Sequence, residues 1–275
     1  MTLRRSDCPS VIPYYGGKYE MSKRLIRMLP PHRRYFEPFF GGGSLYFRKP
    51  KAKWNVLNDI DSDLVNLYIC VANEFDKFSK HVYWYVRSRE LYETFVKEIK
   101  NNNEFALPDP ERASKYFFIV RNAFNNVAYG SFSKDCYWKT QMLDDLKMSR
   151  KKLDGATIEN MDYRNLIDRY EVREGDFFYF DPPYVIADKK KYYRNNFTNE
   201  MHIEMSEYMD KINSRGGTFM ISYDDIPFLR SIYSEYNLNT IDTLYLGSNV
   251  EKRSEVKTEL LITNYEIQQN QIEMF

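Results

Sequence analysis

The stretch DFFYFDPPYV, from Asp176 to Val185, carries the residues best suited to chemistry. Proline has no N–H group and cannot sit inside a β-ladder. Pro182 and Pro183 should therefore end a strand at the carboxyl edge of a sheet, where open α/β sheets bind ligands. The missing N–H groups also leave the carbonyl oxygens of Asp181 and Pro182 without local donors. The turn is expected to be a rigid set of hydrogen-bond acceptors.

This acceptor set predicts the kind of ligand that the turn binds. A carboxylate beside a fixed carbonyl suits an exocyclic NH₂ group, which has two N–H donors, and the ring of Tyr184 offers a stacking face. An aminated base is therefore the natural ligand. The alternative is a turn that merely ends a strand, but its position directly after the run Phe177 to Phe180 favours a functional site.

Glycines mark a second candidate site. Gly41 to Gly43 follow an apolar stretch, and Gly16 and Gly17 precede Lys18. A glycine turn after a first strand lets the backbone approach a ligand closely. Asp59 comes roughly 18 positions after Gly41, where an acid can accept hydrogen bonds from ribose hydroxyls. These features predict an adenosine-containing ligand, although a tight turn followed by a helix cap explains them as well.

Short apolar or β-branched runs alternate with helical patterns along most of the chain. The expected strands are Tyr35 to Phe40, Trp54 to Asn58, Phe177 to Phe180, Thr218 to Ser222 and Leu260 to Thr263. The expected helices are Glu20 to Leu29, Ser44 to Arg48, Asp61 to Ala72, Thr198 to Asn213 and Pro227 to Tyr233. The alternation predicts an α/β fold with a mainly parallel sheet covered by helices.

Two segments depart from this alternation. The strand signal fades from Glu74 to Lys152, where the amphipathic patterns Phe75 to Lys100 and Pro110 to Phe124 lead into a segment of polar and aromatic residues. We expect an inserted, mainly helical module over residues 74–152 and a catalytic domain formed by residues 1–73 and 153–275. Near the end of the chain, Thr240 to Leu246 and Thr258 to Asn264 predict two antiparallel strands.

Composition argues against several classes of protein. The 275 residues are 43% hydrophobic, which is enough for a sizeable core. No window approaches the roughly 18 apolar residues of a membrane span, and the first ten residues do not resemble a signal peptide. The three cysteines and three histidines lack metal-ligand spacing. A dinucleotide fingerprint would need glycine at Tyr46. The formal net charge is only +1, although basic residues cluster before position 35.

Several motifs, in a fixed order, carry a resemblance to one family. They are YYGGK at Tyr14 to Lys18, FEPFFGGG at Phe36 to Gly43, LNDID at Leu57 to Asp61, the DPPY turn, NFT at Asn196 to Thr198 and ELLITNY at Glu259 to Tyr265. In these the chain resembles the Dam-type N6-adenine DNA methyltransferases, whose order is cofactor motif, recognition domain and DPPY. The hairpin Phe124 to Ser133 keeps only part of the family's recognition pattern, so the recognised sequence is not predicted.

The resemblance implies a fold and a reaction. The fold is a Rossmann-like sheet of the methyltransferase type, mostly parallel with an antiparallel C-terminal strand, plus the inserted recognition module. The reaction transfers a methyl group from S-adenosylmethionine to N6 of an adenine flipped out of double-stranded DNA, at a defined sequence, with S-adenosylhomocysteine as the second product and no metal. It also implies a prokaryotic or phage-encoded cytoplasmic protein, with a cognate restriction endonuclease as a candidate partner.

Carried over by position, the resemblance also implies site residues. The cofactor set is Tyr14, Lys18, Glu37, Phe39, Gly41, Gly43, Asp59 and Asp181, with Asp59 on the ribose. The catalytic set is Asp181, Pro182, Pro183 and Tyr184.

Residues that could contact DNA form a third set. In the inserted module they are Arg121, Asn122, Asn125, Asn126 and Tyr129, and after the DPPY turn they are Lys189, Lys190, Lys191 and Arg194. Base-edge or phosphate contacts are the functional interpretation. A capped helix end and a solvated charged loop are the alternatives.

Two other functions remain open at this point. The same acceptor geometry would hold any planar NH₂ group, so cytosine N4 or a glutamine amide are alternative substrates. A DNA-binding relative without activity is the non-enzymatic alternative. The aspartate before Pro182 and the run of motifs favour adenine.

Overall fold

The computed structural model describes residues 8–14, 18, 21–102, 104–134, 138, 141–183, 197–244 and 256–267. The chain divides into two compact units. The first comprises Met1–Lys18, Phe40–Lys51 and Asp59–Asn160, and the second comprises Tyr19–Phe39, Ala52–Asn58 and Met161–Phe275.

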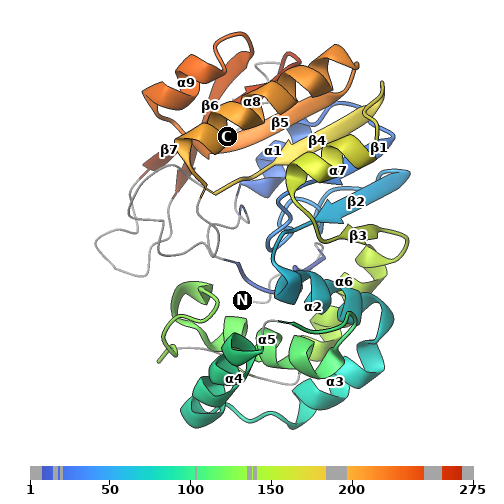
Figure 1. Cartoon of the computed structure of the whole chain (residues 1–275), viewed down its shortest axis with the longest axis vertical. Coiled ribbons are helices and arrows are strands. Elements are labelled where there is room, and N and C mark those ends of the chain that lie inside the picture. Colours follow the sequence, from blue (N-terminus) through green and yellow to red (C-terminus); the bar gives the residue numbers. More distant parts are fainter. Residues whose placement is uncertain are drawn as a thin grey trace, which may run out of the picture. The chain divides into compact units, whose positions relative to one another are not determined.

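The second unit is built on a sheet. Its strands are β1 (Arg34–Glu37), β2 (Trp54–Asn58), β4 (Asp176–Phe180), β5 (Thr218–Asp224), β6 (Asn237–Leu244) and β7 (Val256–Thr263). They lie in the order β2-β1-β4-β5-β7-β6 (Figure 1). Strands β2, β1, β4 and β5 are parallel, whereas β7 is antiparallel to both β5 and β6. The predicted mostly parallel sheet with an antiparallel C-terminal strand is confirmed.

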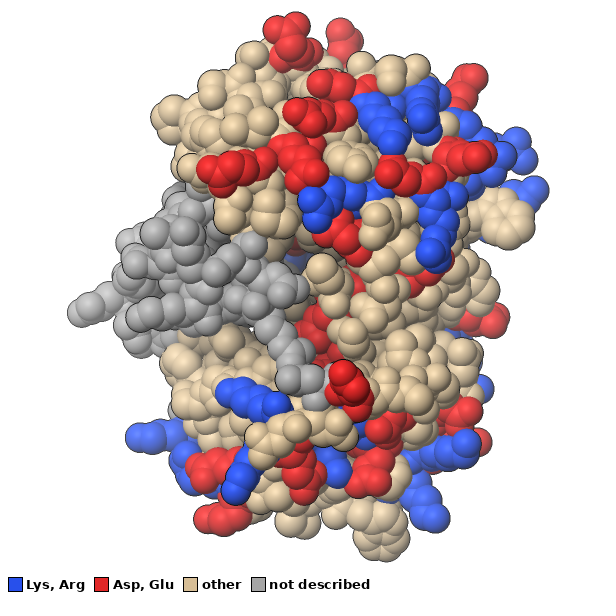
Figure 2. All heavy atoms as spheres, in the orientation of Figure 1, with Lys and Arg blue, Asp and Glu red and all other residues tan. Residues whose placement is uncertain are grey.

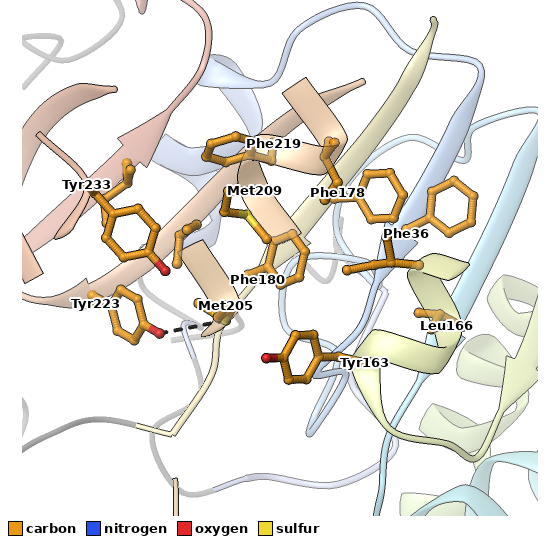
Figure 3. Packing of buried hydrophobic residues seen from close by; sticks show 14 of the residues in the cluster. Phe36, Tyr163, Leu166, Phe178, Phe180, Met205, Met209, Phe219, Tyr223 and Tyr233 are labelled. Carbon is orange, nitrogen blue, oxygen red and sulfur yellow. Dashed lines mark hydrogen bonds between the residues drawn. The ribbon is translucent and has the colours of Figure 1, made fainter. Parts of the chain in front are cut away.

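Helices cover both faces of this sheet. In Figure 1, α7 (Tyr163–Arg169) and α8 (Asn199–Ser214) lie in front of it and α1 (Ser22–Met28) lies behind, while α9 (Pro227–Ile232) follows β5. Phe36 of β1 stacks on Phe178 of β4 with ring centroids 4.4 Å apart, and Met205 and Met209 of α8 belong to the same buried cluster (Figure 3). Burying each such side chain stabilises the fold by about 1.5–3 kcal/mol.

Strand β4 is buried at every position, which explains why its sequence is nearly continuously apolar. Its one charged residue, Asp176, stands at its start. The Arg34 guanidinium donates to both carboxylate oxygens of Asp176 at 2.5 Å, and the Arg173 amide donates a third hydrogen bond at 3.0 Å. This buried pair joins the beginnings of β1 and β4, the strand that ends at the DPPY turn.

The first unit is mainly helical. Its elements are α2 (Ser62–Asn73), α3 (Phe75–Trp84), α4 (Arg89–Asn101), α5 (Pro110–Asn122), the short 3₁₀ helix η1 (Phe124–Asn126), α6 (Met142–Leu153) and the short strand β3 (Thr157–Glu159). Helix α5 is buried on most of its surface and packs against α2, α3 and α4. Its start is held by Asp109, whose carboxylate accepts a hydrogen bond from the Arg112 amide at 2.9 Å.

Several predicted boundaries were wrong. The segment Ser44 to Arg48 forms successive turns rather than a helix, because Gly43 with φ of 63° and Pro50 confine it to little more than one turn. Strand β1 ends at Glu37 instead of Phe40 because Pro38 cannot donate to the ladder. The amphipathic pattern from Phe75 to Lys100 is two helices, and the second begins at the cap Ser88.

Other elements were not predicted. The sequence interpretation included neither α6 nor α7, and it missed the three-residue strand β3. Strand β2 was predicted with its observed ends. Across the described ranges, no helix combines the length and the apolar character that a bilayer span requires.

Removing the Asp176 carboxylate should weaken the fold strongly. In Asp176→Ala, the Arg34 guanidinium, whose side chain is only 13% exposed, would lose its acid, so the free energy of unfolding should fall by about 3 kcal/mol. The control is Asp168→Ala, which removes an acid from the more exposed pair with Lys211 and should cost about 1 kcal/mol or less. Urea denaturation of both variants measures the difference, and equal losses would contradict the assigned importance of the buried pair.

Candidate active site

The glycine turn and Asp59 meet in the first unit, as the sequence predicts. The Gly41 amide donates to Oδ2 of Asp59 at 2.9 Å, and the Asp61 amide donates to Oδ1 at the same distance. The hydroxyl of Tyr68, on α2, donates to the Gly41 carbonyl at 2.7 Å. The turn is therefore held on both sides, by a carboxylate and by a helix.

Glycine is required in this turn for two reasons. Gly41 and Gly43 adopt positive φ angles of 47° and 63°, which side chains other than glycine adopt at a cost. A Cβ atom on Gly42 would lie only 2.6 Å from the Cβ atom of Tyr14. Tyr14 thus packs directly against the turn, so two predicted cofactor residues of the first unit, Tyr14 and Gly41, lie together.

Lys18 also belongs to the first unit and is almost completely buried, at 5% exposure. It was predicted from the GGK sequence as a cofactor residue. A lysine is rarely buried without a role or a partner.

The carboxyl group of Asp59 has an unusual acidity. Part of the residue remains at the surface, but burial of the carboxyl group raises its pKa to about 6, and the backbone hydrogen bonds from Asp61 and Gly41 oppose this rise. The nearby charge of Asp61 raises the pKa further. Because neutral pH lies above this value, the group is mainly an anion, which suits a carboxylate that accepts hydrogen bonds from ligand hydroxyls.

In the second unit, the end of β4 presents Asp181. The parallel register pairs Phe180 with Ile221, so Asp181 and Ser222 follow side by side. The Ser222 hydroxyl donates to Oδ1 of Asp181 at 3.3 Å and is itself 3.0 Å from the Tyr179 hydroxyl. Burial, and then the charge of Asp181, raises the pKa of Tyr179, so Tyr179 keeps its proton. A buried hydroxyl pair therefore orients a partly exposed carboxylate.

The prolines after Asp181 lie as predicted, directly beyond the strand. Pro182 is buried and Pro183 is partly exposed, and β4 ends at Phe180. The remaining member of the predicted catalytic set, Tyr184, lies outside the described residues. So do Lys189, Lys190, Lys191 and Arg194.

Two further cofactor candidates lie at the end of β1 in the same unit. Glu37 is buried and accepts a hydrogen bond from the Tyr35 hydroxyl at 2.6 Å. Phe39 is partly buried, and its ring centroid lies 5.3 Å from that of Tyr163 and 5.9 Å from that of Phe197, the phenylalanine of the NFT motif. The rings of Phe39, Tyr163 and Phe197 therefore lie beyond the end of β1, the strand that carries the buried Glu37.

The predicted DNA-contact residues of the first unit lie at the end of α5, where Arg121 and Asn122 stand, and on the short hairpin, residues 122–133, which begins at the last residue of that helix. The Phe124 amide donates to the Ser131 carbonyl at 2.8 Å, and the Ser133 amide donates to the Asn122 carbonyl at 2.8 Å. Asn125, Asn126 and Tyr129 all have positive φ angles, and Asn125 is exposed. Residues held in such conformations often cluster at functional sites.

The two DNA candidates at the end of α5 differ in their surroundings. Asn122 is fully buried and its amide donates to the Phe118 carbonyl at 2.8 Å, so it closes the last turn of α5. This placement matches the capped-helix alternative for that residue. Arg121 is partly exposed with its guanidinium 5.5 Å from the ring centre of Phe117.

Sequence reasoning missed an arginine pair beside this hairpin. The guanidinium carbons of Arg87 and Arg89 lie 4.5 Å and 4.9 Å from the ring centre of Phe132, and Arg87 also donates to the Ser133 carbonyl at 2.6 Å. Arg87 stands two positions before α4 and Arg89 is the first residue of that helix, and this spacing carried no signal in the sequence beyond ordinary surface charge. On the face that Figure 2 shows, acidic and basic side chains of the described residues are interspersed.

Comparison of the sequence with known protein families identifies the family of this chain. The profile of the D12 class N6 adenine-specific DNA methyltransferases matches residues 14–246, which include the glycine turn, the hairpin and the DPPY turn. The chain belongs to this family, and its sheet is the Rossmann-like sheet of a methyltransferase.

Several relatives are similar over nearly their whole length. The type II methyltransferase M1.LlaDCHI of Lactococcus lactis subsp. cremoris is 25% identical, with 91% of this chain and 93% of the relative covered. The type II methyltransferase M.MjaIII of Methanocaldococcus jannaschii is 25% identical over 92% and 98%. The DNA adenine methylase of Escherichia coli K12 is 26% identical over 84% and 86%.

Filling the glycine turn should destabilise the first unit. In Gly43→Ala, the added Cβ atom would lie 2.5 Å from the Phe40 ring and 2.9 Å from the Phe47 ring, so we expect a loss of about 2–4 kcal/mol from overpacking and backbone strain together. The control is Gly155→Ala, where φ is also positive at 69° but no atom lies within 4 Å of the added Cβ. That variant should lose about 1–2 kcal/mol, from the backbone alone. Equal losses in thermal unfolding would exclude the clash as a cause.

Proposed function

We propose that this chain is a site-specific DNA methyltransferase (adenine-specific), which transfers a methyl group from S-adenosylmethionine to N6 of an adenine in double-stranded DNA. The observation that carries the proposal is Asp181, which stands at the end of β4, oriented by Ser222 and followed by two prolines. Family membership supports both the substrate atom and the methyl donor.

The residues of each unit fit the proposed cofactor. In the first unit, the glycine turn lets a ligand approach the backbone, and Asp59 is a carboxylate able to accept hydrogen bonds from ribose hydroxyls. Tyr14 packs against the turn, and Lys18 of the same unit is almost completely buried. In the second unit, Glu37, Phe39 and Asp181 complete the proposed set. The cofactor, when bound, supplies a methyl group already activated on a sulfonium centre.

The role of the DPPY turn follows from the electronic structure of adenine. The N6 lone pair is delocalised into the ring, so N6 is a poor nucleophile until that pair is localised. We propose that the Asp181 carboxylate and the Pro182 carbonyl each accept a hydrogen bond from one N6 hydrogen. These acceptors stabilise the positive charge that develops on N6 as the new C–N bond forms and the methyl–sulfur bond breaks. N6 loses a proton after the transfer.

DNA must present the adenine outside its stack. Flipping the base costs a few kcal/mol, and Tyr184 is proposed to stack on it. We propose that residues 74–152 form the target-recognition module, since the hairpin belongs to it. Within it, Arg121, Asn125 and Asn126 are the proposed base or phosphate contacts, with Asn122 supporting the hairpin from inside. Lys189, Lys190, Lys191 and Arg194 are proposed phosphate contacts next to the flipped nucleotide.

The biological setting follows from the relatives. Bacterial, archaeal and phage proteins are among them, and some carry type II methyltransferase names. We infer a prokaryotic or phage-encoded enzyme acting in the cytoplasm, with a cognate restriction endonuclease as a candidate partner.

Loss of the Asp181 carboxylate should stop methyl transfer without unfolding the chain. Asp181→Ala removes one of the two N6 acceptors, and we expect the rate to fall by about a hundredfold or more. Tritium transfer from labelled S-adenosylmethionine to DNA, followed by nucleoside analysis, measures it. The matched control is Asp225→Ala, an acid just beyond β5 whose carboxylate pairs with Arg230, and it should keep nearly full activity. Label found in N4-methylcytosine or in protein would refute the adenine assignment.

Cofactor affinity should depend on pH through Asp59. Its folded-state pKa lies above that of an ordinary aspartate, so the group takes up a proton as the pH falls through about 6 and then accepts ribose O–H bonds poorly. Affinity for S-adenosylhomocysteine should therefore weaken below that pH, by up to roughly tenfold per unit. Asp59→Asn should bind weakly at every pH, whereas the exposed control Asp144→Asn should keep the native profile. An unchanged profile in Asp59→Asn, measured by equilibrium dialysis, would argue against ribose binding there.

A further inference from the structure

In the first unit, the proposed function leaves unexplained the two side chains that donate hydrogen bonds to Asp63, Arg112 and Tyr129. Asp63 stands in the first turn of α2 and is 2% exposed. Its Oδ1 atom accepts a hydrogen bond from Nε of Arg112 at 2.6 Å, and its Oδ2 atom accepts one from the Tyr129 hydroxyl at 2.7 Å. One buried carboxylate thus joins α2, α5 and the hairpin 122–133.

Tyr129 is bound there in an unfavourable backbone conformation. Its φ angle is 62°, in the left-handed region that bulky residues seldom occupy. The next residue is also held, because the Tyr92 hydroxyl of α4 donates to the Gly130 carbonyl at 2.7 Å. The bond to Asp63 is thus among the interactions that compensate for this conformation and fix the tip of the hairpin.

The same carboxylate is connected to the proposed ribose-binding acid. The Gly41 amide donates to Asp59, the Asp61 amide donates to Asp59, and the Asp63 amide donates to Oδ1 of Asp61 at 3.0 Å. Asp59, Asp61 and Asp63, which occupy every second position, are therefore linked by successive hydrogen bonds. The series starts at the Gly41 amide and ends at the Tyr129 hydroxyl. Tyr116 of α5, fully buried, packs beside Tyr129 with ring centroids 6.0 Å apart.

We propose that Tyr129 is a positioning residue that couples cofactor binding at Asp59 to DNA binding by the hairpin. The inference rests on the proposed function, since it takes S-adenosylmethionine as the ligand of Asp59 and DNA as the ligand of the hairpin. A ligand bound at either end of the hydrogen-bonded Asp59 to Asp63 segment stabilises the existing arrangement, which the other ligand also requires. By linkage, each ligand must tighten the binding of the other by the same factor.

This proposal differs from a direct DNA contact by Tyr129, which the sequence predicts. A hydroxyl already donated to a buried carboxylate has its single proton committed. A tyrosine that contacts DNA directly contributes to DNA affinity equally with and without the cofactor. A tyrosine that couples the two sites changes the ratio of the DNA affinity with the cofactor to the DNA affinity without it.

The variant Tyr129→Phe tests coupling with little structural damage. It removes one hydroxyl, while Asp63 keeps the Arg112 guanidinium, which is itself fixed by a 2.6 Å hydrogen bond from Nη1 to the Asn102 carbonyl. The matched control is Tyr83→Phe, which removes the hydroxyl of an exposed tyrosine at the end of α3. Cooperative thermal unfolding of both variants at midpoints above the assay temperature shows that the comparison is between folded proteins, even if Tyr129→Phe has the lower midpoint.

The measurement is the affinity for labelled S-adenosylhomocysteine, by equilibrium dialysis, without DNA and with saturating fragments of unmethylated bacterial DNA. In the native chain and in Tyr83→Phe, DNA should tighten binding by about tenfold, within the usual range of such couplings. In Tyr129→Phe, the factor should fall below about twofold. Retention of the native factor in Tyr129→Phe, or a native factor near one, would overturn the coupling and leave the proposed function intact. A native chain that binds no S-adenosylhomocysteine in either condition would overturn both.

Discussion

The hydrogen bond from the Gly41 amide to the Asp59 carboxylate is the interaction on which the first unit's candidate site depends. It closes a turn in which Gly41 and Gly43 adopt conformations that are costly for other residues, and the Tyr68 hydroxyl donates to the carbonyl group of the same glycine, Gly41. A turn fixed at both its N–H and its C=O groups cannot relax when a ligand approaches. The geometry offered to a cofactor is therefore present before binding, which reduces the entropy lost when the cofactor binds.

In the second unit, the position of Asp181 is fixed by the register of β4 and β5. The buried strands β4 and β5 are parallel and aligned, so the first residue beyond β4 must lie beside Ser222 of β5. Arg34 and Asp176 hold the opposite end of β4. A strand anchored at its start and terminated by prolines delivers its carboxylate with little freedom, and an acceptor that is already oriented stabilises developing charge without reorganising in the reaction.

The sequence predicted the parts of this structure that depend on local chemistry. Strand β2, the glycine turn with Asp59 and the strand end at Asp181 follow from proline, glycine and apolar runs that act within a few residues. Elements that depend on tertiary packing could not be predicted in that way. Helix α6 and the break between α3 and α4 carry weak local signals, and the pair of Asp63 with Arg112 joins residues 49 positions apart through the packing of α2 on α5. Asn122 shows the ambiguity most directly, because an asparagine at a helix end can close the helix or reach a ligand, and only its burial distinguishes the two.

The three acids that lead into α2 illustrate how one segment can serve binding and structure. Asp63 is buried with a guanidinium beside it, so its charge is compensated within the protein. The Asp59 carboxylate accepts hydrogen bonds from the backbone amides of Gly41 and Asp61, and burial raises its pKa to about 6. A structural acid would gain from a basic partner, whereas a basic partner at Asp59 would compete with ligand hydroxyls for the same lone pairs. The difference between two carboxylates four residues apart therefore fits different roles: the Asp63 carboxylate joins α2 to α5, and the Asp59 carboxylate is the proposed acceptor of ligand hydroxyls.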